Sequence, residues 1–71
     1  MGEIKIIHIT TEYITLGQFL KFANIIREGG EAKSFLASHL VLVDGVEENR
    51  RGRKLRPGNQ ISVAGKRFEI A

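Results

Sequence analysis

The sequence contains no cysteine and no hydrophobic run of membrane-spanning length, and each absence excludes a class of protein. Without cysteine there can be neither a disulfide framework nor a thiolate metal site, which fits a reducing compartment. The apolar stretch at residues 4–9 is interrupted by Lys5 and His8 and is shorter than the apolar region of a signal peptide. No segment approaches the roughly 18 apolar residues of a transmembrane helix. We therefore expect a soluble, cytoplasmic protein that does not bind a membrane.

Catalytic and metal-binding motifs are also missing. His8 and His39 lack a metal-ligand spacing, and the sequence has neither a G-x-S-x-G elbow nor a cysteine nucleophile. The glycine pair at 29–30 is not followed by the G-K-[ST] of a phosphate-binding loop. Glu47 and Glu48 are adjacent, so in a strand they point to opposite faces, and we expect them to flank a solvated turn. The sequence predicts a protein that is not an enzyme and that holds no cofactor or metal.

The composition is that of a small globular domain. Hydrophobic residues make up 42% and charged residues 27% of a chain of 71 residues, which leaves room for one modest core. No internal repeat, low-complexity tract or long linker divides the chain. We therefore expect a single domain over residues 1–71.

The first half of the chain predicts a strand and two helices. Alternating isoleucines predict a strand at residues 3–10. Thr15 and Gln18 have the spacing of a capping box, and the helix that they open is expected to end at the glycine pair. The apolar stripe expected on this first helix consists of Leu16, Phe19, Leu20, Ala23 and Ile26. A second helix is expected from Glu31, and its buried face is predicted to consist of Ala32, Phe35, Leu36 and Leu40.

The second half predicts short strands joined by tight turns. Asp44-Gly45 lies between the apolar segment 41–43 and Val46, which is a strong signal for a hairpin with a type I′ turn. Pro57-Gly58 predicts another turn, and alternating apolar residues predict a closing hairpin at residues 60–70. The order of elements indicates an α+β domain in which two short helices pack on one face of a small antiparallel sheet.

Charge is distributed unevenly along the chain. Residues 1–49 hold four basic and seven acidic residues, a net charge of −3, whereas residues 50–71 hold seven basic residues and one acidic residue, a net charge of +6. Such an oriented field favours a polyanionic partner. The alternative is that the basic end serves only solubility.

The densest basic segment holds five bases in seven residues, namely Arg50, Arg51, Arg53, Lys54 and Arg56. Arginine presents a planar fork of donors that matches phosphate oxygens in pairs and also stacks on bases. Gly52 lets the backbone bend and approach a phosphate closely. We predict an RNA-binding surface centred on the first four of these bases, although basic runs also form localisation signals or plain solvated surface.

The predicted junction between the two helices adds further basic groups. Arg27 and Lys33 flank the glycine pair, and the first amides of the second helix offer an anion site. A hairpin folded over the helices would join these groups to the basic residues of 50–56 in one continuous basic face. Alternatively, Arg27 compensates a helix dipole and Lys33 is merely solvated. Lys66 and Arg67 beside the last turn are expected to be incidental.

Exposed aromatic residues for base stacking are not expected. The four phenylalanines, Phe19, Phe22, Phe35 and Phe68, mostly fall on core periodicities, and Tyr13 precedes the first helix. This pattern disfavours an aromatic platform for single-stranded bases and favours recognition of RNA shape through phosphates.

Residues 15–63 resemble the S-four RNA-binding domain, also called the alpha-L motif. The matching segments are LGQFLK at 16–21, GEAK at 30–33, VLVDG at 41–45 and RRGRKLRPGNQISV at 50–63. Two turn residues differ from the usual pattern, with Asp44 in place of Asn and Asn59 in place of Asp, and Gly30 replaces a basic residue. Both turn replacements conserve turn chemistry.

The whole chain is similar to the small stand-alone bacterial version of this family. The resemblance implies binding to structured RNA, often ribosomal or transfer RNA. We expect ribosomal RNA as the partner, with the ribosome or a ribosomal subunit, and we expect a monomer. The resemblance also implies the contact residues, which are Arg27, Lys33, Ser34, Arg50, Arg51, Arg53 and Lys54.

Two other functions remain as alternatives. A protein-interaction adaptor of the ubiquitin-like β-grasp type is one, although such carriers typically end in Gly-Gly and this sequence ends in Glu69-Ile70-Ala71. A binder of double-stranded DNA is the other, and it would need a helix with a row of base-reading polar side chains, which neither predicted helix supplies.

Overall fold

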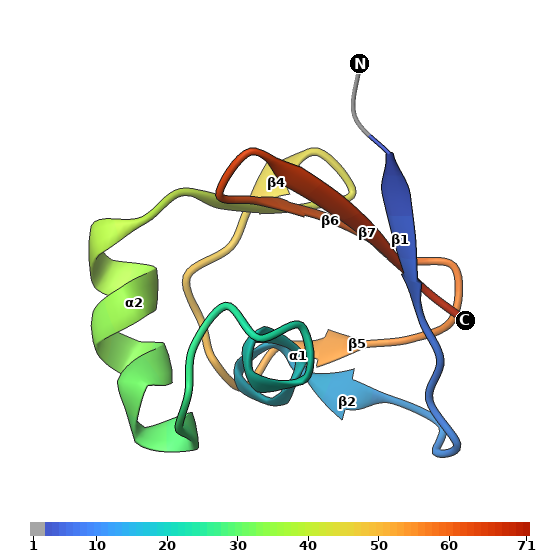
Figure 1. Ribbon diagram of the computed structural model, residues 1–71, viewed down its shortest axis with the longest axis horizontal. Helices are drawn as coiled ribbons and strands as arrows, with labels where there is room; N and C mark the ends of the chain where they lie inside the picture. Colours follow the sequence, from blue (N-terminus) through green and yellow to red (C-terminus); the bar gives the residue numbers. More distant parts are fainter. Residues whose placement is uncertain (1–2) are drawn as a thin grey trace.

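The computed structural model describes residues 3–71, which form a larger sheet on one side and the helices with a smaller sheet on the other (Figure 1). Along the chain the elements are β1 (Ile4–Ile7), β2 (Ile14–Thr15), α1 (Leu16–Phe22), the 3-10 helix η1 (Gly29–Glu31), α2 (Ala32–Ser38), β3 (Val41–Val43), β4 (Val46–Glu47), β5 (Lys54–Leu55), β6 (Gln60–Val63) and β7 (Lys66–Ile70). In the part of the chain that the structure describes, no helix is long and apolar enough to cross a bilayer.

The larger sheet has five strands in the order β1-β7-β6-β3-β4, and the smaller one pairs β2 with β5. The predicted α+β class is confirmed. The large sheet is mixed, however, because β1 runs parallel to β7 while the other pairs are antiparallel. Parallel neighbours need a long crossover connection. Here almost the whole chain lies between the two strands and supplies it.

The core lies between the two layers. Alternate residues of the large sheet point toward the helices, and Phe19 of α1 meets Phe68 of β7 edge to face, with ring centroids 5.1 Å apart. Leu16, Phe19 and Leu20 place the buried stripe of α1 against this face. The buried apolar residues are Ile14, Leu16, Phe19, Leu20, Ile26, Ala32, Leu36, Val41, Val43, Leu55, Ile61, Val63, Phe68 and Ile70.

Both predicted hairpins of the large sheet are present. The β3–β4 turn has φ of 52° at Asp44 and 82° at Gly45, and the β6–β7 turn has φ of 54° at Ala64 and 73° at Gly65. Two consecutive positive φ values are what a type I′ turn requires. Gly58 after Pro57 also has a positive φ, as the predicted turn demands.

The two replaced turn residues lie in contact, although 15 positions separate them. The Asn59 amide donates to the Asp44 carboxylate at 2.6 Å, and the backbone N–H of Gln60 donates to the other Asp44 oxygen at 2.9 Å. The side-chain oxygen of Asn59 accepts from the backbone N–H of Arg56 at 2.7 Å. The two replacements therefore form a matched pair in this chain, with Asn59 as the donor and Asp44 as the acceptor of one hydrogen bond.

The first helix is shorter than its apolar pattern predicts. It begins at the predicted capping box, in which Thr15 and Gln18 exchange hydrogen bonds, but it ends at Phe22 instead of at the glycine pair. Asn24 has a φ of 59°, and the N–H groups of Asn24 and Ile25 donate to the carbonyls of Lys21 and Leu20. This is the Schellman arrangement, in which a left-handed residue ends a helix. Ile26 then reaches the core from the loop.

The second helix also differs at its ends. The 3-10 turn η1 occupies residues 29–31, so α2 begins at Ala32, and Ala32 and Leu36 are buried as predicted. Phe35 is only half-buried and stacks on the His39 ring, with centroids 4.1 Å apart. The prediction that Leu40 is buried is wrong, because the helix ends at Ser38 and Leu40 leaves the helical period with 60% exposure.

Candidate nucleic-acid interface

The arginine segment, residues 48–56, runs from β4 to β5 and is fixed by its backbone to the start of α1. The N–H of Leu16 donates to the Arg53 carbonyl at 2.8 Å, and the N–H of Gly17 donates to the Arg51 carbonyl at 2.9 Å. The first amides of a helix have no partner within the helix. Here the arginine segment supplies the acceptors, so its carbonyls face α1 and its backbone is held in place.

Gly17 lies where these segments come close together, with room for a Cβ atom at ordinary van der Waals distance. A Cβ atom at this position would lie 3.4 Å from the Ala32 Cβ, 3.5 Å from the Arg51 carbonyl oxygen and 3.6 Å from the Arg51 Cβ. Three segments, α1, α2 and the arginine segment, therefore meet at one point. The sequence comparison with the RNA-binding family includes Gly17, but its packing role depends on contacts that only the fold brings together.

The C-terminal end of the arginine segment contains β5 and is fixed by the pairing of β5 with β2. Ile14 and Thr15 of β2 pair with Leu55 and Lys54, and Leu55 is fully buried. Next to this pair, the Tyr13 ring lies under the Lys54 ammonium at 5.0 Å and the Arg56 guanidinium at 5.6 Å. Such cation–π contacts orient long cationic side chains that would otherwise move freely. Tyr13 is thus a positioning residue that the sequence alone did not identify.

Glu48 occupies the opposite end of the segment and binds two of its arginines. Its carboxylate accepts from the Arg50 Nε at 2.9 Å and from a terminal nitrogen of Arg53 at 3.3 Å, and the backbone N–H of Arg50 donates to it at 3.1 Å. The Glu48 side chain is only 8% exposed, whereas Arg50 is 74% and Arg53 36% exposed. The prediction that Glu48 flanks a solvated turn is therefore wrong.

The electrostatics of this cluster follow from the hydrogen bonds. The Arg50 side chain, the Arg50 backbone N–H and the Arg53 side chain together lower the pKa of Glu48 to about 2, and burial opposes them. In return, the Glu48 carboxylate raises the pKa of Arg50 above its usual value. Glu48 therefore stays ionised and partly neutralises Arg50 and Arg53. Within residues 3–71, no carboxylate lies within 4 Å of the charged groups of Arg51, Lys54 or Arg56.

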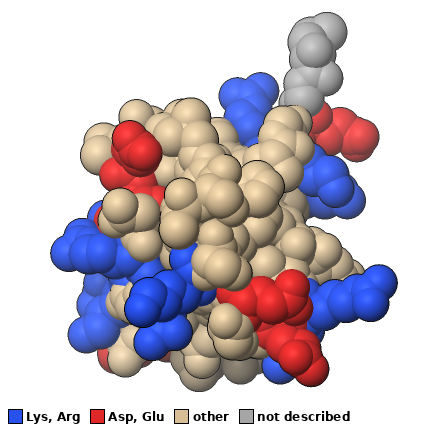
Figure 2. Space-filling view, turned by 90° about the vertical axis from the view of Figure 1, so that its left-hand side faces the viewer, with Lys and Arg blue, Asp and Glu red and all other residues tan. Residues whose placement is uncertain are grey.

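Two shallow depressions adjoin at Gly52. One is lined by the cationic side of the segment, namely Arg50, Gly52, Arg53, Lys54, Arg56 and Asn59. The other lies between α1, η1 and the segment, and is lined by Thr15, Gly17, Gln18, Lys21, Gly29, Ala32, Arg51 and Gly52. Lys and Arg side chains gather along one edge of the molecular face shown in Figure 2. Lys21, which is not among the predicted contact residues, shares the second depression with Arg51.

The predicted helix junction contributes differently from what its sequence suggested. Arg27, Lys33 and Ser34 are exposed, but none of them lines either depression. Ser34 donates its hydroxyl to the Glu31 carbonyl at 3.1 Å. Of the predicted contact residues, Arg50, Arg53 and Lys54 line the first depression and Arg51 lines the second, whereas Arg27, Lys33 and Ser34 line neither.

The predicted anion site at the start of the second helix is not formed. The N–H groups of Glu31 and Ala32 donate to the carbonyls of Glu28 and Gly29 within η1. The Glu31 carboxylate also accepts from the Glu28 N–H at 2.9 Å. These amides are therefore already bonded, and the carboxylate beside them repels an anion.

The expectation that exposed aromatic residues are absent is also wrong. Phe22 is 59% exposed because α1 ends there, and Tyr13 is 37% exposed. Phe22 lies at the last position of a helix whose apolar pattern suggested two further turns. Asn24 was the sequence feature that could have predicted the exposure of Phe22, because asparagine favours the left-handed conformation that ends a helix.

The comparisons with known proteins agree with this geometry. The family model of the S4 domain matches residues 7–71, which exceeds the 15–63 range of the quoted motifs. A relative from Bacillus subtilis (strain 168), named "Probable ribosome maturation protein RlbA", is 56% identical over 59 residues, which cover 83% of each chain. With its α+β architecture and a match over nearly its whole length, the chain belongs to the S4 domain family.

Proposed function

We propose that this chain is a non-catalytic, cytoplasmic RNA-binding protein that recognises structured ribosomal RNA through the arginine segment and takes part in ribosome maturation. The observation that carries the proposal is the backbone attachment of this segment to α1 and β2, which presents the cations Arg51, Lys54 and Arg56 on a rigid support. Binding groups on rigid supports lose less conformational entropy when they bind.

The relationship to other proteins supports the ribosomal part of the proposal. The relative from Bacillus subtilis carries a name that refers to ribosome maturation, and its identity to this chain is 56%. The S4 domain also corresponds to the RNA-binding family that the sequence resembles. Folded RNA offers closely spaced phosphates, which suit a compact patch of arginines and lysines.

The binding mechanism follows from the charges. Arg51, Lys54 and Arg56 neutralise phosphates directly and release their counterions. Glu48 fixes the side chains of Arg50 and Arg53 and partly neutralises their charge. These two arginines therefore contribute to binding mainly by donating N–H groups to a phosphate in a defined position. Gly52 lies between the two depressions and leaves room for the RNA backbone.

Charge reversal with a matched control tests the proposal. We expect Arg51→Glu with Lys54→Glu to weaken binding to structured ribosomal RNA fragments by at least about tenfold, because two phosphate contacts become repulsive. Lys66→Glu with Arg67→Glu changes the net charge equally but alters the β6–β7 hairpin end, which lies outside both depressions. Filter binding and thermal melts should show weak RNA binding by the first variant alone, with both variants folded. An equal loss in the two variants would contradict the proposed interface.

A further inference from the structure

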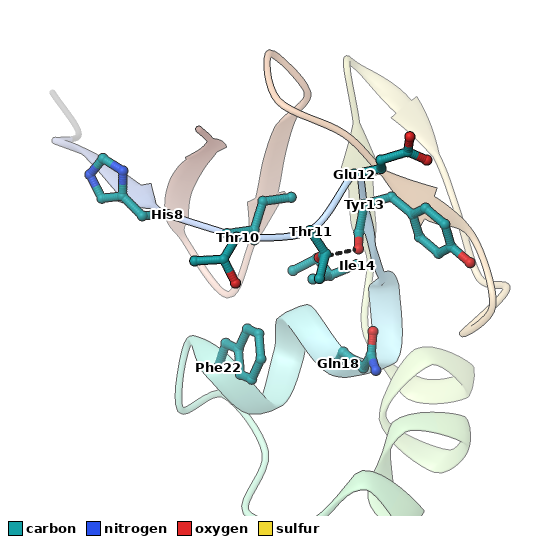
Figure 3. A pocket seen from close by; sticks show the side chains of 9 residues that line it. His8, Thr10, Thr11, Glu12, Tyr13, Ile14, Gln18 and Phe22 are labelled. Carbon is teal, nitrogen blue, oxygen red and sulfur yellow. Dashed lines mark hydrogen bonds between the residues drawn. The ribbon is translucent and has the colours of Figure 1, made fainter.

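A depression separate from the two cationic ones lies between α1 and the linker that joins β1 to β2 (Figure 3). The side chains that matter for its chemistry are His8, Ile9, Thr10, Tyr13, Gln18 and Phe22. It has no role in the binding mechanism described so far. Apolar and polar side chains line it, and Tyr13 in its lining contacts two cationic side chains.

Phe22 forms the apolar end of this depression. Its ring is 59% exposed and lies on the side of α1 that faces the linker (Figure 3). Ile9 is half-buried and Ile14 is buried beside it. An aromatic ring left open next to aliphatic side chains offers one flat face for stacking.

Polar groups at the same depression have free hydrogen-bonding capacity. The Gln18 carbonyl oxygen accepts from the Thr15 N–H at 2.9 Å, so its amide NH₂ remains available as a donor, and no partner for the NH₂ lies within residues 3–71. The Thr10 hydroxyl also has no partner among these described residues, whereas the Thr11 hydroxyl donates to the Tyr13 carbonyl. The Glu12 carboxylate points away from Phe22, so it does not repel an electron-rich ligand there (Figure 3).

One residue that lines this depression also contacts the cations. Tyr13 lines it, and the same Tyr13 ring supports the Lys54 ammonium and the Arg56 guanidinium at 5.0 and 5.6 Å. Lys54 and Arg56 belong to the first cationic depression. Because Tyr13 borders this depression and carries the two cations on its ring, positive charge lies next to the depression.

We propose that this depression holds one unpaired nucleobase of the bound RNA, stacked on Phe22, while the adjoining phosphate lies against Lys54 and Arg56. This inference rests on the proposed function and adds the structural class of RNA, namely a helix with a bulged or flipped-out nucleotide. A paired base cannot enter, because its faces and its Watson–Crick edge are already occupied. An apolar peptide would use the Phe22 ring but would gain nothing from the cations, so the combination favours a nucleotide.

Two RNA hairpins provide the test, one fully paired and one that differs from it only by a single bulged 2-aminopurine. We expect the wild-type protein to prefer the bulged hairpin by about tenfold, because stacking of a base on an aromatic side chain has about this strength. The fluorescence of the bulged base should fall on binding as the base stacks.

Variants of Phe22 distinguish the contribution of base stacking from that of the phosphate contacts. Phe22→Ala should remove the preference and the fluorescence change while it keeps the affinity for the paired hairpin, and Phe22→Trp should retain both. Leu40→Ala is the matched control, because Leu40 is equally exposed at 60% but lines a different depression. Equal wild-type binding of the two hairpins, or a preference that survives Phe22→Ala, would overturn the inference and leave the proposed function intact. Absence of salt-sensitive binding to either hairpin would instead overturn the proposed function.

Discussion

Glu48 shows how a single residue organises the proposed binding surface. A buried carboxylate is unfavourable unless it is paired and hydrogen-bonded. Here four N–H groups from Arg50 and Arg53 satisfy it. The carboxylate in turn limits the rotamers of two arginines, which lose rotational freedom before any RNA arrives.

The pH dependence of stability tests the role of Glu48. Its pKa in the folded protein is about 2, below its ordinary value of 4.5, so its contribution to the free energy of unfolding is complete above that ordinary value and is lost as the pH falls toward 2. Glu48→Gln should lower stability at neutral pH by about 1 kcal/mol and flatten the acid decline. Urea unfolding at several pH values measures both effects. Glu47→Gln, at the exposed neighbouring position, should leave the decline unchanged; identical profiles for the two variants would refute the assignment.

Substitution of Gly17 tests the contact between α1, α2 and the arginine segment. Gly17→Ala should be tolerated or raise stability by up to about 1 kcal/mol, because a Cβ meets its nearest neighbour at 3.4 Å and alanine favours the helix. Gly17→Val adds two methyl groups at this point and should cost about 1–3 kcal/mol through overpacking. Thermal melts give the stabilities, and RNA binding should weaken only in the valine variant. A neutral Gly17→Val would show that the contact is loose.

Local residue patterns were predictable from the sequence, whereas residues that depend on tertiary contacts were not. The Thr15–Gln18 capping box depends on a spacing of three and is present as predicted. The burial of Glu48 accompanies its bonds to Arg50 and Arg53, and the stacking of Tyr13 under Lys54 depends on the pairing of β2 with β5. These strands have two residues each, too few to show an alternating pattern.

At the scale of the elements, the turns were the most predictable part of the fold. Asp44-Gly45 and Ala64-Gly65 both form the expected hairpins, because turn chemistry acts within two residues. The end of α1 was mispredicted because the apolar pattern continues through Ala23 and Ile26. Asn24 nevertheless ends the helix, and the apolar residues beyond it pack against the core from a loop.

Exchange of Asp44 and Asn59 tests the link between two turns. Asn59→Asp alone should destabilise the fold by about 1–2 kcal/mol, because it brings two carboxylates into contact where an amide donated at 2.6 Å. The double variant Asp44→Asn with Asn59→Asp should recover most of this loss, since donor and acceptor are exchanged again. A double-mutant cycle from urea unfolding measures the coupling. Additive effects of the two substitutions would show that the hydrogen bond contributes nothing.

At the scale of the whole molecule, the uneven distribution of charge along the sequence produces a basic region on the protein surface. The basic half, with a net charge of +6, supplies the arginine segment, and Glu48 is the acidic residue of the first half that pairs with it within residues 3–71. The sequence predicted this basic centre and its α+β support. It did not predict that Lys21 would share a depression with Arg51, or that the Tyr13 ring would lie under Lys54 and Arg56, because both depend on tertiary contacts.

The salt dependence of RNA affinity tests the central claim most directly. If three to four cations of the arginine segment displace counterions from duplex-like RNA, the logarithm of the association constant should fall against the logarithm of salt concentration with a slope of about −3. Arg51→Glu with Lys54→Glu should reduce the magnitude of this slope by about 2, since each lost phosphate contact removes nearly one unit. A wild-type slope near zero, or an unchanged slope in the variant, would contradict the account that this segment binds RNA phosphates.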